Sequence, residues 1–260
     1  MSIKIIHTMD VAPERMEERD GWAISEFRLP VTGETGSATT VFHSIFRAGS
    51  THAKHLHTES DEIAVYLSGH GVVGQGDSRA VVTAGHCRLM PKGSVHFFHN
   101  ETEDEDARVI GFYMNAPDVA GTGYEFHGKV EAADIDRPRE GLDDGILVRL
   151  EESGPDSAHI PPAWAQATVR TPIGAHNGSE NALVHVTVPP GAELGTHSFA
   201  NAEAIYFVVS GEGEADGEAL RPESFVFVPQ ATDHAIRNTG AGEMELYLVL
   251  TGAGSLKQAA

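Results

Sequence analysis

The spacing of histidines, glutamate and turn residues between Gly49 and Asn100 constrains this chain more than any other feature. His55 and His57 are two residues apart, so on a strand they point to the same face. Glu62 opens a second expected strand, and His96 lies on a third. Turn residues separate these strands, namely Gly49, Gly69, Gly85, Pro91 and Gly93. If the strands share one barrel, the four side chains converge on one interior point.

Three imidazoles and one carboxylate are donor types that a divalent transition metal prefers. A lone His-x-His pair is commonly a pair of surface histidines. Here a third histidine, a glutamate and regularly placed turn residues accompany the pair, so we interpret His55, His57, Glu62 and His96 as a metal site.

Two segments, Gly49–Gly69 and Gly85–Asn100, match the two signature motifs of the cupin superfamily without a mismatch. The chain therefore resembles that superfamily. The 15 residues from His70 to Ala84 resemble the short spacing of microbial cupins. The resemblance implies a small antiparallel β-barrel with the metal inside, bound by His55, His57, Glu62 and His96. It does not imply one reaction, because cupins include dioxygenases, decarboxylases, isomerases, lyases, hydrolases and binding proteins.

A weaker copy of the motifs follows after about 140 residues. Gly191 to His197 corresponds to Gly49 to His55, and Pro229 to Asn238 corresponds to Pro91 to Asn100. Such self-similarity predicts a repeated architecture. We therefore expect an all-β bicupin with two double-stranded β-helix (jelly-roll) barrels. The expected domains are an N-terminal barrel at residues 1–130, a connector at 131–162 and a C-terminal barrel at 163–260.

Strand-forming segments rich in β-branched and aromatic residues support this expectation. The N-terminal barrel is expected to use Ile3–Ile6, Thr40–Arg47, Ile63–Leu67, Val72–Gly74, Ala80–Thr83, Val95–Phe98 and Arg108–Met114. The C-terminal barrel is expected to use Leu183–Val188, Ala204–Val209, Ser224–Val228, His234–Arg237 and Met244–Leu250. Ile146–Val148 in the connector is a candidate edge strand.

The second copy is altered at the ligand positions. Phe199 replaces His57, and counting back from Gly211 places Ala204 where the first copy has Glu62. Because faces alternate along a strand, this offset turns Glu203 away from the interior unless a bulge restores it. We expect a barrel that has lost its metal. The alternative is a triad of two histidines and one carboxylate that holds non-haem iron, made of His197, Glu203 and His234.

Composition limits the partners. Lys and Arg number 18 against 38 Asp and Glu, and the net charge of −20 makes nucleic acid an unfavourable partner. Cys87 is the only cysteine, which excludes a disulfide within the chain and fits a cytoplasmic protein. We interpret it as a buried apolar filler rather than a nucleophile. Residues 1–30 contain no signal-peptide pattern, and no apolar run is long enough for a membrane span.

Strand alternation indicates which neighbours of the ligands line the pocket. If Glu62 points inward, so does Tyr66, and if His96 points inward, so does Phe98. Tyr66 is a candidate proton donor, His52 a candidate acid or base near the mouth, and Glu62 a ligand that also tunes the chemistry. Tyr66, Phe98 and Arg47 are candidate substrate-binding residues. His86 and His99 are expected to support the site or lie on the surface.

Three function classes remain open. An octahedral ion with these ligands keeps two positions free, which favours an enzyme. The preferred class is an Fe(II) dioxygenase acting on a small chelating substrate such as a diketone, keto acid or phenol. The second is a redox-neutral isomerase, decarboxylase or hydrolase using Mn, Ni or Zn. Bicupin ureidoglycine aminohydrolases are similar in plan, although their metal lies in the C-terminal barrel. The third is a non-enzymatic small-molecule-binding cupin. Exposed sheet edges favour a homodimer or a larger assembly of it.

Overall fold

A computed structural model describes residues 2–15, 24–155 and 160–260 of the chain. Residues 156–159 of the expected connector and part of the first 30 residues lie outside the described ranges. The fold divides into two compact units. The N-terminal barrel consists of Ala12–Gly33 and Thr39–Arg149, and the C-terminal barrel consists of Met1–Val11, Glu34–Ala38 and Leu150–Ala260.

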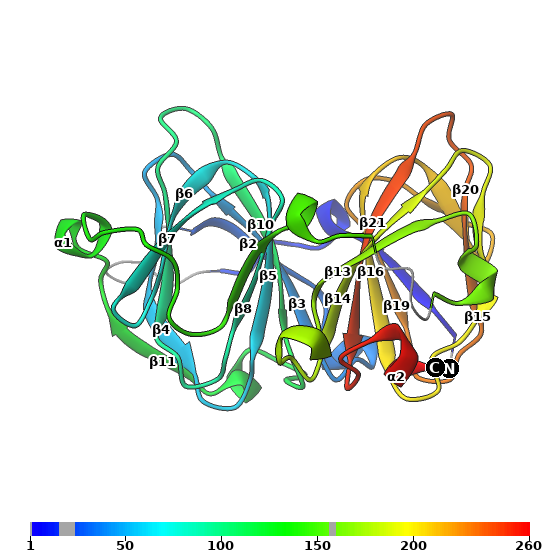
Figure 1. The fold of residues 1–260 in the computed structure, drawn as a ribbon, viewed down its shortest axis with the longest axis horizontal. Helices are drawn as coiled ribbons and strands as arrows, with labels where there is room; N and C mark the ends of the chain where they lie inside the picture. Colours follow the sequence, from blue (N-terminus) through cyan, green and yellow to red (C-terminus); the bar gives the residue numbers. More distant parts are fainter. Residues whose placement is uncertain (1, 16–23, 156–159) are drawn as a thin grey trace. The chain divides into compact units, whose positions relative to one another are not determined.

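The N-terminal barrel is built from two antiparallel sheets (Figure 1). The first sheet has the order β12 (Ile146–Arg149), β8 (His86–Met90), β5 (Glu62–Ser68), β10 (Ala107–Tyr113), β3 (Thr40–Phe46) and β2 (Ile24–Val31). The second has the order β11 (Tyr124–Gly128), β4 (Thr51–His57), β9 (His96–Asn100), β6 (His70–Gln75) and β7 (Ser78–Thr83). A four-residue helix, α1 (Ala132–Ile135), lies between β11 and β12.

The C-terminal barrel repeats this plan. Its larger sheet has the order β1 (Lys4–His7), β19 (Ser224–Val228), β16 (Glu203–Ser210), β21 (Met244–Thr251), β14 (Ala182–Val188) and β13 (Thr168–Ile173). Its smaller sheet has the order β15 (Glu193–His197), β20 (His234–Asn238), β17 (Gly213–Ala215) and β18 (Glu218–Leu220). A short helix, α2 (Leu256–Ala259), follows β21. The predicted all-β fold with two jelly-roll barrels is confirmed. No helix in the described part of the chain is long and apolar enough to cross a membrane.

The expected placement of Ile3–Ile6 in the N-terminal barrel is wrong. These residues form part of β1, which pairs antiparallel with β19 of the C-terminal barrel. In the N-terminal barrel, the corresponding strand β8 pairs with β12 from the connector, which confirms the expected edge strand at Ile146–Val148. Without β1 and β12, strands β19 and β8 would each expose unpaired backbone donors and acceptors, so each barrel covers that edge with a strand from outside the repeat.

The two interiors differ in what fills them. In the C-terminal barrel, β14 contributes Val184, Val186 and Val188 to a continuous apolar core. In the N-terminal barrel, the inward positions of β3 are Phe42, Ser44 and Phe46, and all three line a cavity.

The cavity wall depends on one glycine. Gly111 on β10 lies directly opposite Phe42 on β3, and a Cβ atom added at Gly111 would come within 2.0 Å of the Phe42 ring. The ring cannot easily retreat, because it packs against Phe27 and Tyr113 with centroid distances of 5.7 Å and 4.9 Å. A side chain at residue 111 would therefore push Phe42 out of place.

We expect Gly111→Ala to lower the free energy of unfolding by about 1–3 kcal/mol, the usual cost of overpacking a core. Urea unfolding followed by circular dichroism measures this change. Gly242→Ala is the control, because nothing lies within 4 Å of its added Cβ, and its effect should stay within about 0.5 kcal/mol. Equal stability of the two variants would contradict this account of the cavity wall.

Candidate metal centre

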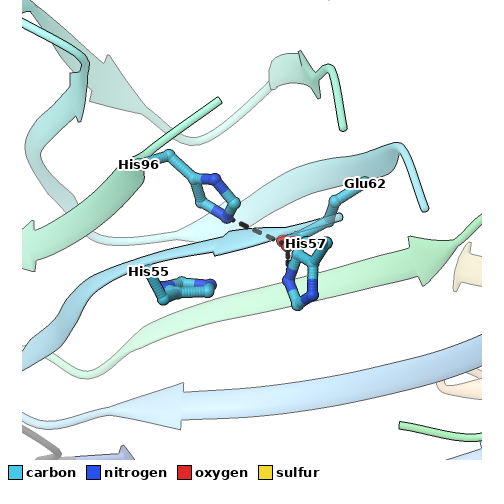
Figure 2. Close-up of side chains that lie close together, drawn as sticks. All are labelled: His55, His57, Glu62 and His96. Atoms are coloured by element: carbon cyan, nitrogen blue, oxygen red, sulfur yellow. Dashed lines mark hydrogen bonds and ion pairs between the residues drawn. The ribbon is translucent and has the colours of Figure 1, made fainter. Parts of the chain in front are cut away.

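The structure brings the four predicted side chains together inside the N-terminal barrel (Figure 2). His55 and His57 come from the end of β4, Glu62 from the start of β5 and His96 from the start of β9. One donor atom from each residue lies within 4.8 Å of the others. All four residues are buried, so the group has the compactness and the shielding from water that a metal site needs.

A β-bulge in β4 brings a further histidine to the same cavity. His52 pairs with Phe98 and His55 pairs with His96, so β4 uses one more residue than β9 over this stretch. The extra residue breaks the alternation of faces and turns both His52 and His55 inward. Their rings lie 4.0 Å apart. His52 is therefore a half-buried strand residue that lines the cavity, and burial lowers its pKa to about 3.

The outer ring nitrogens of the three ligand histidines are fixed by hydrogen bonds. His55 Nδ1 lies 2.8 Å from the Ala53 carbonyl, and His96 Nδ1 lies 2.9 Å from the Ser94 carbonyl. His57 Nδ1 lies 2.9 Å from the Thr122 hydroxyl, whose own proton is donated to the Val119 carbonyl. Each acceptor requires a proton on Nδ1, so each Nε2 points its lone pair inward, as ligand histidines do.

The inward-facing atoms fit a cation. Glu62 Oε2 lies 3.2 Å from Nε2 of both His57 and His96 (Figure 2). Burial lowers the pKa of His96 despite its interaction with Glu62, and burial lowers the pKa of His55 well below its usual value. Burial alone would raise the pKa of Glu62, but the closeness of the His57 and His96 rings brings that pKa well below normal. Neutral imidazole lone pairs and a carboxylate facing one another repel, and a divalent ion between them removes that repulsion.

The site opens into a cavity with about 410 Å³ of empty space, part of which is solvent at its mouth. Its polar lining includes Ser44, His52, Tyr66 and Arg88, besides three of the four metal-site residues. The remaining lining is aromatic or apolar, including Phe27, Phe42, Phe46, Met90, Phe98 and Tyr113. A mostly apolar cavity with a few convergent polar groups is typical of small-molecule sites.

Most of the predicted pocket residues lie in this cavity. Tyr66 and Phe98 line it, as strand alternation predicted from Glu62 and His96. Arg47 does not line it: it is exposed, just after the end of β3, and its position in the alternation belongs to the outward face. His86 and His99 are half-buried and outside the lining. Cys87 is fully buried on β8 next to the inward-facing Arg88, which fits an apolar filler.

Three residues at the site were not anticipated from the sequence. Arg88 and Tyr113 line the cavity, and Thr122 holds His57. Alternation could have found the first two, because Arg88 pairs with Ala64 and Tyr113 pairs with Glu62, both inward-facing on β5. Thr122 lies in a short 3-10 turn, η3 (Ala120–Thr122), and no local pattern marks it.

Two tyrosines in the cavity keep their protons. Burial raises the pKa of Tyr66, although the neighbouring Arg88 guanidinium opposes this shift. Burial raises the pKa of Tyr113 well above its usual value, and the charge of Glu62 adds to the shift. Both side chains therefore offer a neutral hydroxyl that can donate a hydrogen bond or a proton.

In the C-terminal barrel, a tyrosine hydroxyl lies between the two histidines that correspond to His55 and His96. The Tyr206 hydroxyl lies 3.1 Å from His197 Nε2 and 2.9 Å from His234 Nε2. Ala204 points into the core at the position that corresponds to Glu62. Glu203 turns away and accepts hydrogen bonds from the Ser37 hydroxyl and the Ala38 amide. Among the described residues, only the N-terminal barrel holds a group suited to a metal ion. The predicted outward turn of Glu203 is confirmed.

Fold and site together define a two-barrel β-protein with one buried group of metal-binding side chains. The cupin domain model matches residues 42–113 and 184–250, more than half of the chain. The chain therefore belongs to the cupin family, with one cupin domain in each barrel, as its motifs predicted.

Named relatives share part of this sequence. Oxalate oxidase GF-3.8 of Triticum aestivum is 33% identical over an alignment of 82 residues that covers 28% of this chain and 37% of that protein. Oxalate oxidase 2 of Hordeum vulgare is 32% identical over an alignment of the same length, which covers the same fractions of the two proteins. The match thus spans little more than a third of the length of these relatives.

Solved structures of oxalate decarboxylase from Bacillus subtilis share the fold over nearly the whole chain. One has a TM-score of 0.71 at 15% identity and covers 96% of this chain and 77% of that one. Another, from work on the Mn(II) centres of that enzyme, has a TM-score of 0.71 at 16% identity with the same coverage. At this identity the likeness establishes the two-barrel fold.

We expect about one divalent ion per chain, because only one complete donor set is present in the described structure. Replacing both His55 and His57 with alanine should remove most of the metal, which elemental analysis of purified protein measures. His197→Ala is the matched control in the C-terminal barrel and should leave the metal content unchanged. Near-stoichiometric metal in the double variant, or its loss in the control, would contradict the assignment.

Proposed function

We propose that the chain is a metal-dependent enzyme that breaks a carbon–carbon bond in a small carboxylate substrate, releasing carbon dioxide. The observation that carries this proposal is the buried group of three imidazoles and one carboxylate at the wall of a small cavity. Support comes from relatives named oxalate oxidase and from solved structures of oxalate decarboxylase with the same fold.

His55, His57, Glu62 and His96 would hold the ion. The same donor set accepts Mn, Fe, Ni and Zn, so it does not select one metal. We expected iron from the sequence. We now propose manganese as the first candidate, because one of the similar solved structures concerns Mn(II) centres. Held by these residues, a divalent ion would supply Lewis-acid chemistry, since it would bind a carboxylate and stabilise negative charge that develops beside it.

The side chains of the cavity would do the remaining chemistry. Loss of carbon dioxide leaves an electron pair on the adjacent carbon, and that carbon must take up a proton. Tyr66 and Tyr113 carry neutral hydroxyls in the cavity and are the candidate proton donors. The low pKa of His52 keeps its imidazole neutral near pH 7, so it can act as a base or hydrogen-bond partner but not as a cationic acid. Phe98 and the other aromatic walls limit water around the substrate.

An oxygen-dependent reaction is the second candidate. The relatives at 33% and 32% identity are named oxidases, and an Fe(II) dioxygenase is the reaction class that we preferred from the sequence. His55, His57, Glu62 and His96 would hold the redox-active ion that such a reaction needs. The two candidates differ in one measurable quantity, the O₂ consumed for each substrate lost.

The decisive experiment supplies the manganese-loaded protein with oxalate and a panel of small keto acids, diketones and catechols. We expect carbon dioxide release without stoichiometric O₂ uptake, measured by headspace gas analysis and an oxygen electrode. The His55→Ala, His57→Ala double variant is the control and should be inactive. Stoichiometric O₂ uptake would move the chain to the second candidate. Ligand binding without turnover of any compound would place it among the non-enzymatic cupins.

We also propose a homodimer or a larger assembly of it, located in the cytoplasm. Each sheet ends in edge strands such as β2 and β13, which supports association because native proteins cover or pair such edges. The single, buried Cys87 fits a reducing compartment. Multi-angle light scattering at micromolar concentration tests the assembly, and a mass of only 27.8 kDa, that of one chain, would exclude it.

A further inference from the structure

Arg88 is a buried cation beside the metal group. It lies on β8 directly opposite Ala64 of β5, and both residues point into the N-terminal barrel. Its side chain is 1% exposed and lines the same cavity as His55, Glu62 and His96. A charged side chain so deep in a barrel has lost its hydration, and that loss is costly unless another charge compensates it.

The hydrogen bonds of Arg88 hold it in place but leave its charge uncompensated. Nη1 donates to the Phe97 carbonyl at 3.3 Å, and Nη2 donates to the Gly74 carbonyl at 2.8 Å and to Gln75 Oε1 at 3.2 Å. All three acceptors are neutral. The Nε donor is buried without a hydrogen-bond partner. No carboxylate among the described residues forms an ion pair with this guanidinium.

Arg79 shows what a compensated arginine looks like in the same barrel. Its side chain is 2% exposed, and its Nη2 lies 3.4 Å from the Asp134 carboxylate. Arg79 does not line the cavity. The barrel therefore provides a carboxylate for the buried arginine with a structural role, and it provides none for the arginine that faces the cavity.

The charges around the cavity indicate what completes the site. Besides Arg88, the acidic or basic lining of the cavity is the Glu62 carboxylate, and the other lining residues are histidine, tyrosine, serine and apolar side chains. With a divalent ion in place, the ion, the guanidinium and the Glu62 carboxylate leave two positive charges. A dianion would neutralise them, whereas a monoanion would leave one buried positive charge uncompensated.

We propose that Arg88 selects doubly charged, chelating substrates by binding the carboxylate that the metal does not neutralise. This inference rests on the metal site of the proposed function and specifies the substrate class, a small dicarboxylate. An arginine fixed by backbone carbonyls is suited to this role, because little conformational freedom is lost when its remaining N–H groups meet a carboxylate. Arg88 thereby takes the role that the sequence led us to expect for Arg47.

The test measures binding rather than turnover. Cobalt(II) is loaded as a spectroscopic substitute, and its visible absorption is titrated with oxalate and with glycolate, a chelator of one charge. Wild-type protein should bind oxalate at least about 10-fold more tightly than glycolate. Arg88→Met should weaken oxalate binding by about 10²-fold, the usual effect of removing one partner of a buried charge pair. Glycolate binding should change by less than about 3-fold in the same variant.

Matched variants keep the test decisive. Arg47→Met removes an exposed arginine outside the cavity and should leave both affinities unchanged. Arg88→Lys keeps the charge, so if Arg88→Met fails to fold, this variant should retain the oxalate preference with weaker binding. Equal affinities for oxalate and glycolate in the wild type would overturn the proposal without any variant. Equal loss of both ligands in Arg88→Met would also overturn it.

The outcome separates this inference from the proposed function. Selective oxalate binding by a protein that turns over no substrate would support the role of Arg88 and reject the enzyme. Turnover of small carboxylates without charge selectivity would support the enzyme and reject the role of Arg88. Failure of the wild-type protein to take up cobalt would overturn both.

Discussion

Hydrogen bonds to the outer nitrogens of three histidines govern the chemistry of this chain. The carbonyls of Ala53 and Ser94 and the hydroxyl of Thr122 each accept a proton from an Nδ1 atom. They set the tautomers, so that all three Nε2 lone pairs face Glu62 in the barrel interior. Two of these acceptors lie two residues before the histidine that they hold, so the strand backbone itself orients the ligand. Such outer partners are as important to a metal site as the ligands.

The two barrels show how few substitutions separate a metal site from a packed core. Both contain the bulge that turns a histidine inward, after His52 in β4 and after Leu194 in β15. In the N-terminal barrel, Ala64 leaves room for the cavity beside Glu62. In the C-terminal barrel, Tyr206 stands at the position that corresponds to Ala64, and its hydroxyl bridges His197 and His234. The hydroxyl can donate its one proton to either Nε2 atom, and Ala204 supplies no carboxylate there to complete a metal site.

The acidic composition makes the cavity electrostatically distinct. The chain carries a net charge of −20, yet the charged lining of the cavity consists of one carboxylate and one guanidinium. Burial keeps the lining histidines neutral, because the charged form would lose its hydration. A divalent ion held by the four ligands would make the interior cationic beneath an acidic chain, and the attraction for an anion would then lie inside the barrel.

The sequence by itself determined the repeat, the fold class and the four metal-site side chains, because turn glycines and two-residue alternation are local properties of the chain. It also determined that Glu203 turns outward, since a one-residue offset reverses a strand face. Only the tertiary structure decided where β1 pairs, because either barrel could have used that strand to cover an edge. Only the tertiary structure identified Arg88 and Thr122 at the site and moved Arg47 out of it. Which residues share a cavity depends on pairing between strands far apart in the chain, and local patterns do not encode that pairing.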